Sequence, residues 1–137
     1  MPITPTIAIH MTAAIGAVVT GPVALWARKG AKQHPKLHRA FGYAWVTLMI
    51  ITAVSAIFIL DRTILNVAGF TPIHLLIPVT FVALYFAFRS LARGDIPKHR
   101  QTMQRLYFAA CIVAGLFTLL PNRLIGHFLW SQLGALA

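Results

Sequence analysis

Long apolar stretches alternate with short polar segments along the whole chain. Four stretches are about 20 residues long, which is the length an α-helix needs to cross roughly 30 Å of hydrocarbon. They cover residues 7–27, 40–60, 73–92 and 101–120. Because backbone groups in lipid must be paired within their own segment, these stretches predict helices and not strands. The shorter apolar segment 124–136 predicts an interfacial helix.

The amino-acid composition supports a membrane protein and excludes a soluble domain. Hydrophobic residues make up 58% of the chain and charged residues only 10%, and the mean hydropathy is +0.76. A soluble domain carries roughly 25% charged residues, and a disordered chain would leave too much apolar surface in water. We therefore predict an all-α fold, with residues 1–137 forming a single transmembrane domain built as an up-down-up-down four-helix bundle.

The positive charge is concentrated in two of the polar segments. The chain has twelve Lys and Arg against two acidic residues, giving a net charge of +10. All the basic residues except Arg62 and Arg123 lie in segments 28–39 and 89–105. Such clusters between apolar stretches predict cytoplasmic loops of a bacterial inner-membrane protein, with both termini on the outer side. This distribution does not favour nucleic-acid binding.

The four predicted helices form a duplicated hairpin. Each helix begins with a proline that is followed within a few residues by a histidine: Pro5 and His10, Pro35 and His38, Pro72 and His74, Pro97 and His99. Duplicated hairpins are commonly related by a pseudo-two-fold axis along the membrane normal. We therefore expect His10 to face His74 near the outer leaflet, and His38 to face His99 near the inner leaflet.

Two imidazoles facing each other across a bundle axis are the ligands that six-coordinate haem iron requires. The positive end of the helix dipole disfavours the protonated ring in the first turns, which keeps the ring neutral and able to bind a metal. Arg39 and Arg100 directly follow the inner histidines and are candidates to pair with haem propionates. The sequence thus predicts one or two b-type haems, bound by His10, His74, His38 and His99.

Small residues on the first helix offer a candidate slot for a flat macrocycle. Ala13, Ala14, Ala17, Gly21 and Ala24 share one face at helical spacing. Opposite this face we expect aromatic side chains of the third helix: Phe81, Tyr85 and Phe88. The same small-residue face is, however, more typical of close helix packing.

Other interpretations stay open at this stage. The histidines could serve interfaces in a non-catalytic membrane subunit of a larger complex. They could also bind quinone, copper or zinc without haem. Besides membrane lipid, the expected partner is a quinone or a redox protein, in either a homo-oligomer or a complex. Whether the chain is an enzyme is not decided, and the single Cys111 excludes a disulfide framework.

Several motifs together resemble a known family over nearly the whole chain. They are His10, Gly21-Pro22, His38-Arg39-x-x-Gly42-Tyr43 and His99-Arg100-x-x-Met103. The chain resembles a bacterial membrane family called domain of unknown function 2306, which implies a small four-helix protein and brings no established activity.

The alternating histidines are more distantly similar to the cytochrome b561-like architecture. Proteins with that architecture hold two b-type haems in a four-helix core and move electrons across the membrane. The resemblance implies that His10 and His74 bind the outer haem, and that His38 and His99 bind the inner one. The histidines of this chain lie nearer to the helix ends than that architecture implies.

Overall fold

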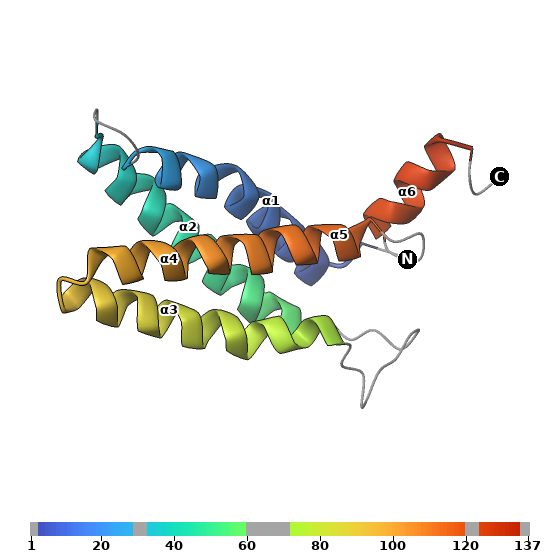
Figure 1. Cartoon of the computed structure of the whole chain (residues 1–137). Coiled ribbons are helices and arrows are strands. Elements are labelled where there is room, and N and C mark those ends of the chain that lie inside the picture. Colours follow the sequence, from blue (N-terminus) through green and yellow to red (C-terminus); the bar gives the residue numbers. More distant parts are fainter. Residues whose placement is uncertain (1–2, 29–32, 60–71, 120–123, 135–137) are drawn as a thin grey trace.

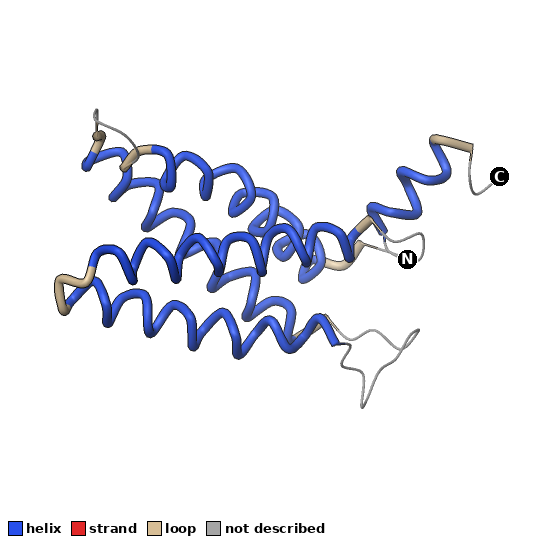
Figure 2. The backbone as a smooth tube through the Cα atoms, viewed as in Figure 1, coloured by secondary structure: helices blue, strands red, loops and turns tan. Residues whose placement is uncertain are grey.

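A computed structural model describes residues 3–28, 33–59, 72–119 and 124–134, and all the regular elements in these ranges are helical. The main elements form two helical hairpins (Figures 1 and 2). The first hairpin consists of α1 (Pro5–Trp26) and α2 (Pro35–Ile57), and the second of α3 (Leu76–Ala92) and α4 (Ile96–Tyr107). The end of α1 and the start of α2 lie on the same side of the molecule as the turn from α3 to α4. We call this side the basic end, because it carries Arg28, Lys36, Lys98 and Arg100.

The starts of the helices follow from local sequence signals. Thr4 caps α1 by accepting a hydrogen bond from the Ile7 backbone N–H at 3.3 Å. Asp95 caps α4 by accepting one from the Lys98 N–H at 3.2 Å. Each of these helices, like α2, has a proline in its first turn, where the missing N–H costs no hydrogen bond. Gly94 has φ +76° and lets the chain reverse between α3 and α4.

The four expected spans differ in regularity. α1 and α2 are long and apolar enough to cross a membrane, and α3 is a shorter apolar helix of 17 residues. A 3-10 turn, η1 (Pro72–Leu75), precedes α3. The fourth helical path starts at Ile96, next to the predicted helix-start proline Pro97 and before the apolar span that begins at 101, and it is not one regular α-helix. It passes from α4 through a π-helical segment, η2 (Phe108–Val113), into α5 (Ala114–Thr118).

The segment predicted to lie at the interface contains a short helix, α6 (Leu124–Gln132). The Trp130 indole N–H donates to the Leu119 carbonyl at 2.9 Å, which ties α6 to the end of the fourth helical path. The predicted span ends at 60 and 120, and the last residues of the interfacial segment, lie outside the described residues.

A hydrophobic core forms where the two hairpins meet. It contains one residue of α1, two of α2, one of α3 and three of the fourth helical path: Ala17, Trp45, Met49, Leu84, Leu106, Tyr107 and Cys111. α2 packs on α3, and α1 packs on η2. The two hairpins therefore contact each other at two places, between α2 and α3 and between α1 and η2.

The small-residue face of α1 has two environments. Ala13 and Ala17 are buried and do not line the cavity at the basic end, whereas Gly21 and Ala24 of the same face do line it. The expectation of an aromatic wall opposite this face is wrong for two residues, because Phe81 is 40% exposed and Tyr85 is 61% exposed. The rotation of α3 about its axis turns both outward, whereas Phe88 lines a cavity at the basic end.

Candidate functional site

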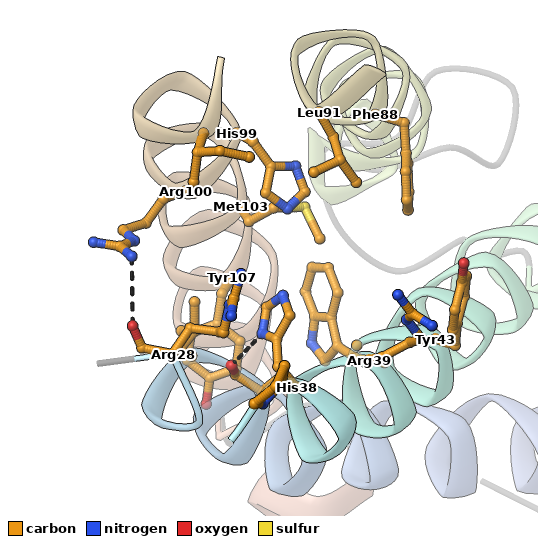
Figure 3. Close-up of a pocket in the computed structure, with 17 residues that line it drawn as sticks. Arg28, His38, Arg39, Tyr43, Phe88, Leu91, His99, Arg100, Met103 and Tyr107 are labelled. Carbon is orange, nitrogen blue, oxygen red and sulfur yellow. Dashed lines mark hydrogen bonds between the residues drawn. The ribbon is translucent and has the colours of Figure 1, made fainter. Parts of the chain in front are cut away.

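A cavity of about 350 Å³ lies at the basic end, between the two hairpins (Figure 3). Residues of α1, α2, α3 and α4 all contribute to its wall. The volume lies within the range of roughly 300–1,000 Å³ that is typical of small-molecule and cofactor sites. The wall includes four residues that the sequence analysis selected: His38, Arg39, His99 and Arg100.

His38 and His99 project into the cavity from different hairpins (Figure 3). The Nδ1 atom of His38 lies 2.8 Å from the carbonyl oxygen of Ala24, on α1. The Nδ1 atom of His99 lies 2.9 Å from the carbonyl oxygen of Ala87, on α3. In both hairpins, therefore, the histidine in the first turns of the second helix is tied to the last turns of the first helix.

These two hydrogen bonds determine which ring nitrogen can act as a ligand. A carbonyl oxygen only accepts, so the Nδ1 atom of each ring carries the proton and Nε2 keeps its lone pair. Among the described residues, neither Nε2 atom has a hydrogen-bond partner. A ring that donates its other N–H to a backbone carbonyl is the usual arrangement of a metal-ligating histidine, because the bond fixes both tautomer and orientation.

Three arginines give the rim of the cavity a positive charge. They are Arg28, Arg39 and Arg100, and the Arg100 guanidinium donates to the Arg28 carbonyl at 3.4 Å. No carboxylate lines this cavity. Asp95 is the only acidic side chain in the described part of the chain, and it serves as the cap of α4. The rim is therefore complementary to an anionic group, which arginine can bind through paired N–H donors.

Trp45 lies in the wall at the deep end of the cavity and is 3% exposed. Its indole N–H makes no well-formed hydrogen bond among the described residues, and the Cys111 thiol lies beside it. A Cβ placed on Gly21 would lie 3.0 Å from the Trp45 Nε1 atom, so this N–H lies against α1. The N–H is therefore covered by protein, and Trp45 contributes apolar surface to the cavity wall.

The cavity is also lined by three residues that were not predicted from the sequence: Arg28, Trp45 and Tyr107. One available signal was the spacing of seven residues from His38 to Trp45, which places both on one face of a helix. Arg28 was counted only as a member of a basic cluster. These residues meet at one cavity because of the way the two hairpins cross, and no local sequence pattern predicts that crossing.

The outer histidines occupy a different environment, against the end of α2 remote from the cavity. The His10 Nδ1 atom lies 3.0 Å from the Thr52 carbonyl oxygen and 3.0 Å from the Ser55 hydroxyl. The His74 Nε2 atom lies 3.2 Å from the Ala56 carbonyl oxygen and 3.1 Å from that of Ile59. The structure thus brings both rings to neighbouring turns of α2, and neither ring lines the basic-end cavity.

The two remaining histidines lie apart from these sites. His34 stacks on Trp26, with ring centroids 5.6 Å apart and an interplanar angle of 20°. His127 is exposed on α6. In residues 3–28, 33–59, 72–119 and 124–134, no group of three or more His, Cys, Asp or Glu side chains could hold a metal ion.

Comparison with known proteins identifies a family. No curated protein and no solved structure matches the chain, so the similarity to the cytochrome b561-like architecture stays a prediction. A family model described as "Predicted membrane protein (DUF2306)" matches residues 7–132, which include the described helices almost completely. As the sequence motifs predicted, the chain belongs to the DUF2306 family of predicted membrane proteins.

Proposed function

We propose that the chain is a membrane protein that binds b-type haem in the basic-end cavity and transfers single electrons. One observation carries the proposal: two imidazoles from different hairpins, each with Nδ1 bonded to a carbonyl oxygen, line the same cavity. His38 and His99 would hold the haem iron, each through Nε2. When bound, haem supplies the one-electron couple of its iron.

The rest of the cavity suits the same occupant. Arg39 and Arg100, together with Arg28, would bind the propionates at the exposed rim. Phe88, Leu91 and other apolar side chains would exclude water from the ring. The chain's own contribution is therefore to orient two neutral imidazoles, neutralise the charge of the propionates and exclude water from the porphyrin ring.

The topology follows from the charge distribution. We place the two hairpins as an up-down-up-down four-helix bundle in a bacterial inner membrane, with the basic end in the cytoplasm and both termini outside. The cavity then lies close to the cytoplasmic surface, where a quinone or a redox protein would exchange electrons with it. His10 and His74 are proposed as ligands of a second, outer haem, and support for that site comes from the sequence pattern.

Absorbance spectroscopy tests the haem proposal directly. We expect the protein purified in detergent and supplied with haem to show a sharp α band after reduction with dithionite. In a His10→Ala/His74→Ala background, which removes the proposed outer ligands, His38→Ala and His99→Ala should each abolish this six-coordinate signature. The matched control is His127→Ala, which removes an exposed histidine outside the cavity and should leave the spectrum unchanged. A wild-type protein that binds no haem, or a spectrum that survives both inner substitutions, would refute the proposal.

The Nε2 atoms of His38 and His99 also suit one second candidate, a hydroquinone-type headgroup in the same cavity. Each hydroxyl of such a headgroup would donate to one imidazole Nε2. Under this alternative, His38→Ala and His99→Ala should each weaken binding of a short-chain quinol in detergent, and the protein supplied with haem should show no α band. If the purified protein binds haem and no quinol, this second candidate is excluded.

A further inference from the structure

Tyr107 of α4 makes two contacts with α1 at the deep end of the cavity. Its ring lies so close to Gly21 that a Cβ at this position would overlap with the ring atoms Cε2 and Cδ2. Its hydroxyl donates to the Val18 carbonyl at 3.1 Å, close to one helical turn from Gly21. The ring is 8% exposed and also packs on Trp45. Held at both the ring and the hydroxyl, Tyr107 has little freedom to move away from α1.

The same two helices, α1 and α4, also hold the inner histidines: α1 bonds to the His38 ring, and α4 carries His99. On α4, His99, Met103 and Tyr107 follow one another at spacings of four residues and all line the cavity, so they share one helical face. Tyr107 and His99 are therefore joined by about 12 Å of rigid helix. On α1, Gly21 lies three residues before Ala24, whose carbonyl holds the His38 ring.

A continuous chain of contacts thus connects the two proposed ligands. It runs from His38 to Ala24, along α1 to Gly21, across to Tyr107, and back along α4 to His99. Directly after Tyr107 the helix changes to the π geometry of η2. Such π segments are frequent at functional sites, and here the change follows the last residue of the cavity-facing stripe.

We infer that the close contact between Gly21 and Tyr107, which joins α1 to α4 and is called the joint below, positions His99 relative to His38. This inference rests on the proposed role of the basic-end cavity as a cofactor site. Gly21 and Tyr107 are positioning residues: they act on the ligands through the helices that carry them. A larger side chain at position 21 would push α4 away from α1 and move one imidazole away from the other.

Two alanine substitutions on α1 test the joint. Gly21→Ala must displace the Tyr107 ring, which is held in place by its hydrogen bond to Val18. Gly16→Ala is the matched control, because its new Cβ would lie 2.9 Å from the Leu48 Cδ1 atom, the tip of a flexible side chain. We expect Gly21→Ala to weaken haem binding by at least about tenfold, as outer-shell changes typically do, and to diminish the six-coordinate spectrum. Gly16→Ala should change neither.

A distance measurement separates the joint from the haem proposal. Nitroxide labels at Lys36→Cys and Lys98→Cys, in a Cys111→Ala background, report the separation of the helix starts that carry the two histidines. Both lysines are exposed. We expect electron–electron double resonance without haem to give a longer label separation for Gly21→Ala and a normal one for Gly16→Ala. Adding Tyr107→Leu to Gly21→Ala should restore the mean separation, because the smaller side chain removes the overlap, while the distribution stays broad because the hydrogen bond to Val18 is lost.

Each result has a defined meaning. An unchanged label separation in Gly21→Ala overturns the joint, whatever the protein binds. A changed separation in a protein that binds no haem leaves the joint standing and refutes the haem proposal. If Gly21→Ala does not yield folded protein, Tyr107→Phe replaces it, because this change removes only the hydrogen bond to Val18. A broader distance distribution is then expected, and an unchanged one overturns the joint.

Discussion

The His38 ring is bound to the backbone of the preceding helix, with its Nδ1 atom 2.8 Å from the Ala24 carbonyl oxygen. The second hairpin repeats this relationship between His99 and Ala87. A backbone acceptor cannot be removed by a side-chain change, and its position is set by the helix itself. The orientation of both imidazoles is therefore a property of how each hairpin closes.

The first prediction concerns the tautomers of the inner histidines. In the ligand-free protein, His38 and His99 should both carry the proton on Nδ1, because only a donor can bond to a carbonyl oxygen. Nitrogen NMR of protein with labelled histidine distinguishes the two ring nitrogens. His127 is exposed and serves as the internal reference for an unconstrained ring. A proton on Nε2 of either inner ring would contradict the structure.

The second prediction concerns charge at the rim of the cavity. Arg39→Gln and Arg100→Gln should each weaken the binding of haem several-fold, since a charge-assisted hydrogen bond contributes roughly 1.5–3 kcal/mol and exposure reduces this value. Arg93→Gln removes a charge at the same end that does not line the cavity, and should have little effect. Iron porphyrin with esterified propionates should bind the wild type and the Gln variants equally. A preference of the wild type for the ester would argue against propionate binding by these arginines.

The third prediction concerns the outer histidine His10. Ser55→Ala removes a buried hydroxyl that lies 3.0 Å from the His10 Nδ1 atom and donates to the Thr52 carbonyl. The Thr52 carbonyl remains available to His10, so the loss in the free energy of unfolding should be about 1 kcal/mol. Unfolding by titration with SDS in detergent micelles measures it. As a control, Thr12→Ala removes an exposed hydroxyl that bonds only within α1, and it should cost less.

The fourth prediction concerns the turn between α3 and α4. Gly94 has φ +76°, a left-handed conformation that costs a residue with a side chain about 1–2 kcal/mol. Gly94→Ala should lower the free energy of unfolding by about this amount. Gly115→Ala should be neutral or slightly stabilising, because beyond its own stretch of helix no described atom lies within 4 Å of its new Cβ, and alanine favours a helix. Equal effects of the two substitutions would show that the turn tolerates a side chain.

The sequence predicted the helices well because their start signals are local. Thr4 and Asp95 each cap a helix, as their side-chain chemistry favours. His38 and His99 were found because two copies of one short pattern placed them at equivalent helix starts, and the structure brings both to one cavity.

Features that depend on the contact between hairpins were not predicted. α3 exposes Tyr85 and buries a stripe of mostly small or polar residues, Thr80, Leu84, Ala87 and Ser90, which the prediction from aromatic side chains overlooked. The π segment after Tyr107 was also missed, because no proline or glycine marks it within residues 108–113. The positions of Trp45 and Arg28 at the cavity became evident only once all four helices were in place.

The duplicated histidine anchor has a consequence for assembly. Each imidazole is bonded to a backbone carbonyl of its own hairpin, so the position of its nitrogen lone pair does not depend on a bond to the other hairpin. A ligand that needs both lone pairs would bind only when the two hairpins are packed together. Binding of that ligand would therefore indicate that the two hairpins have assembled correctly.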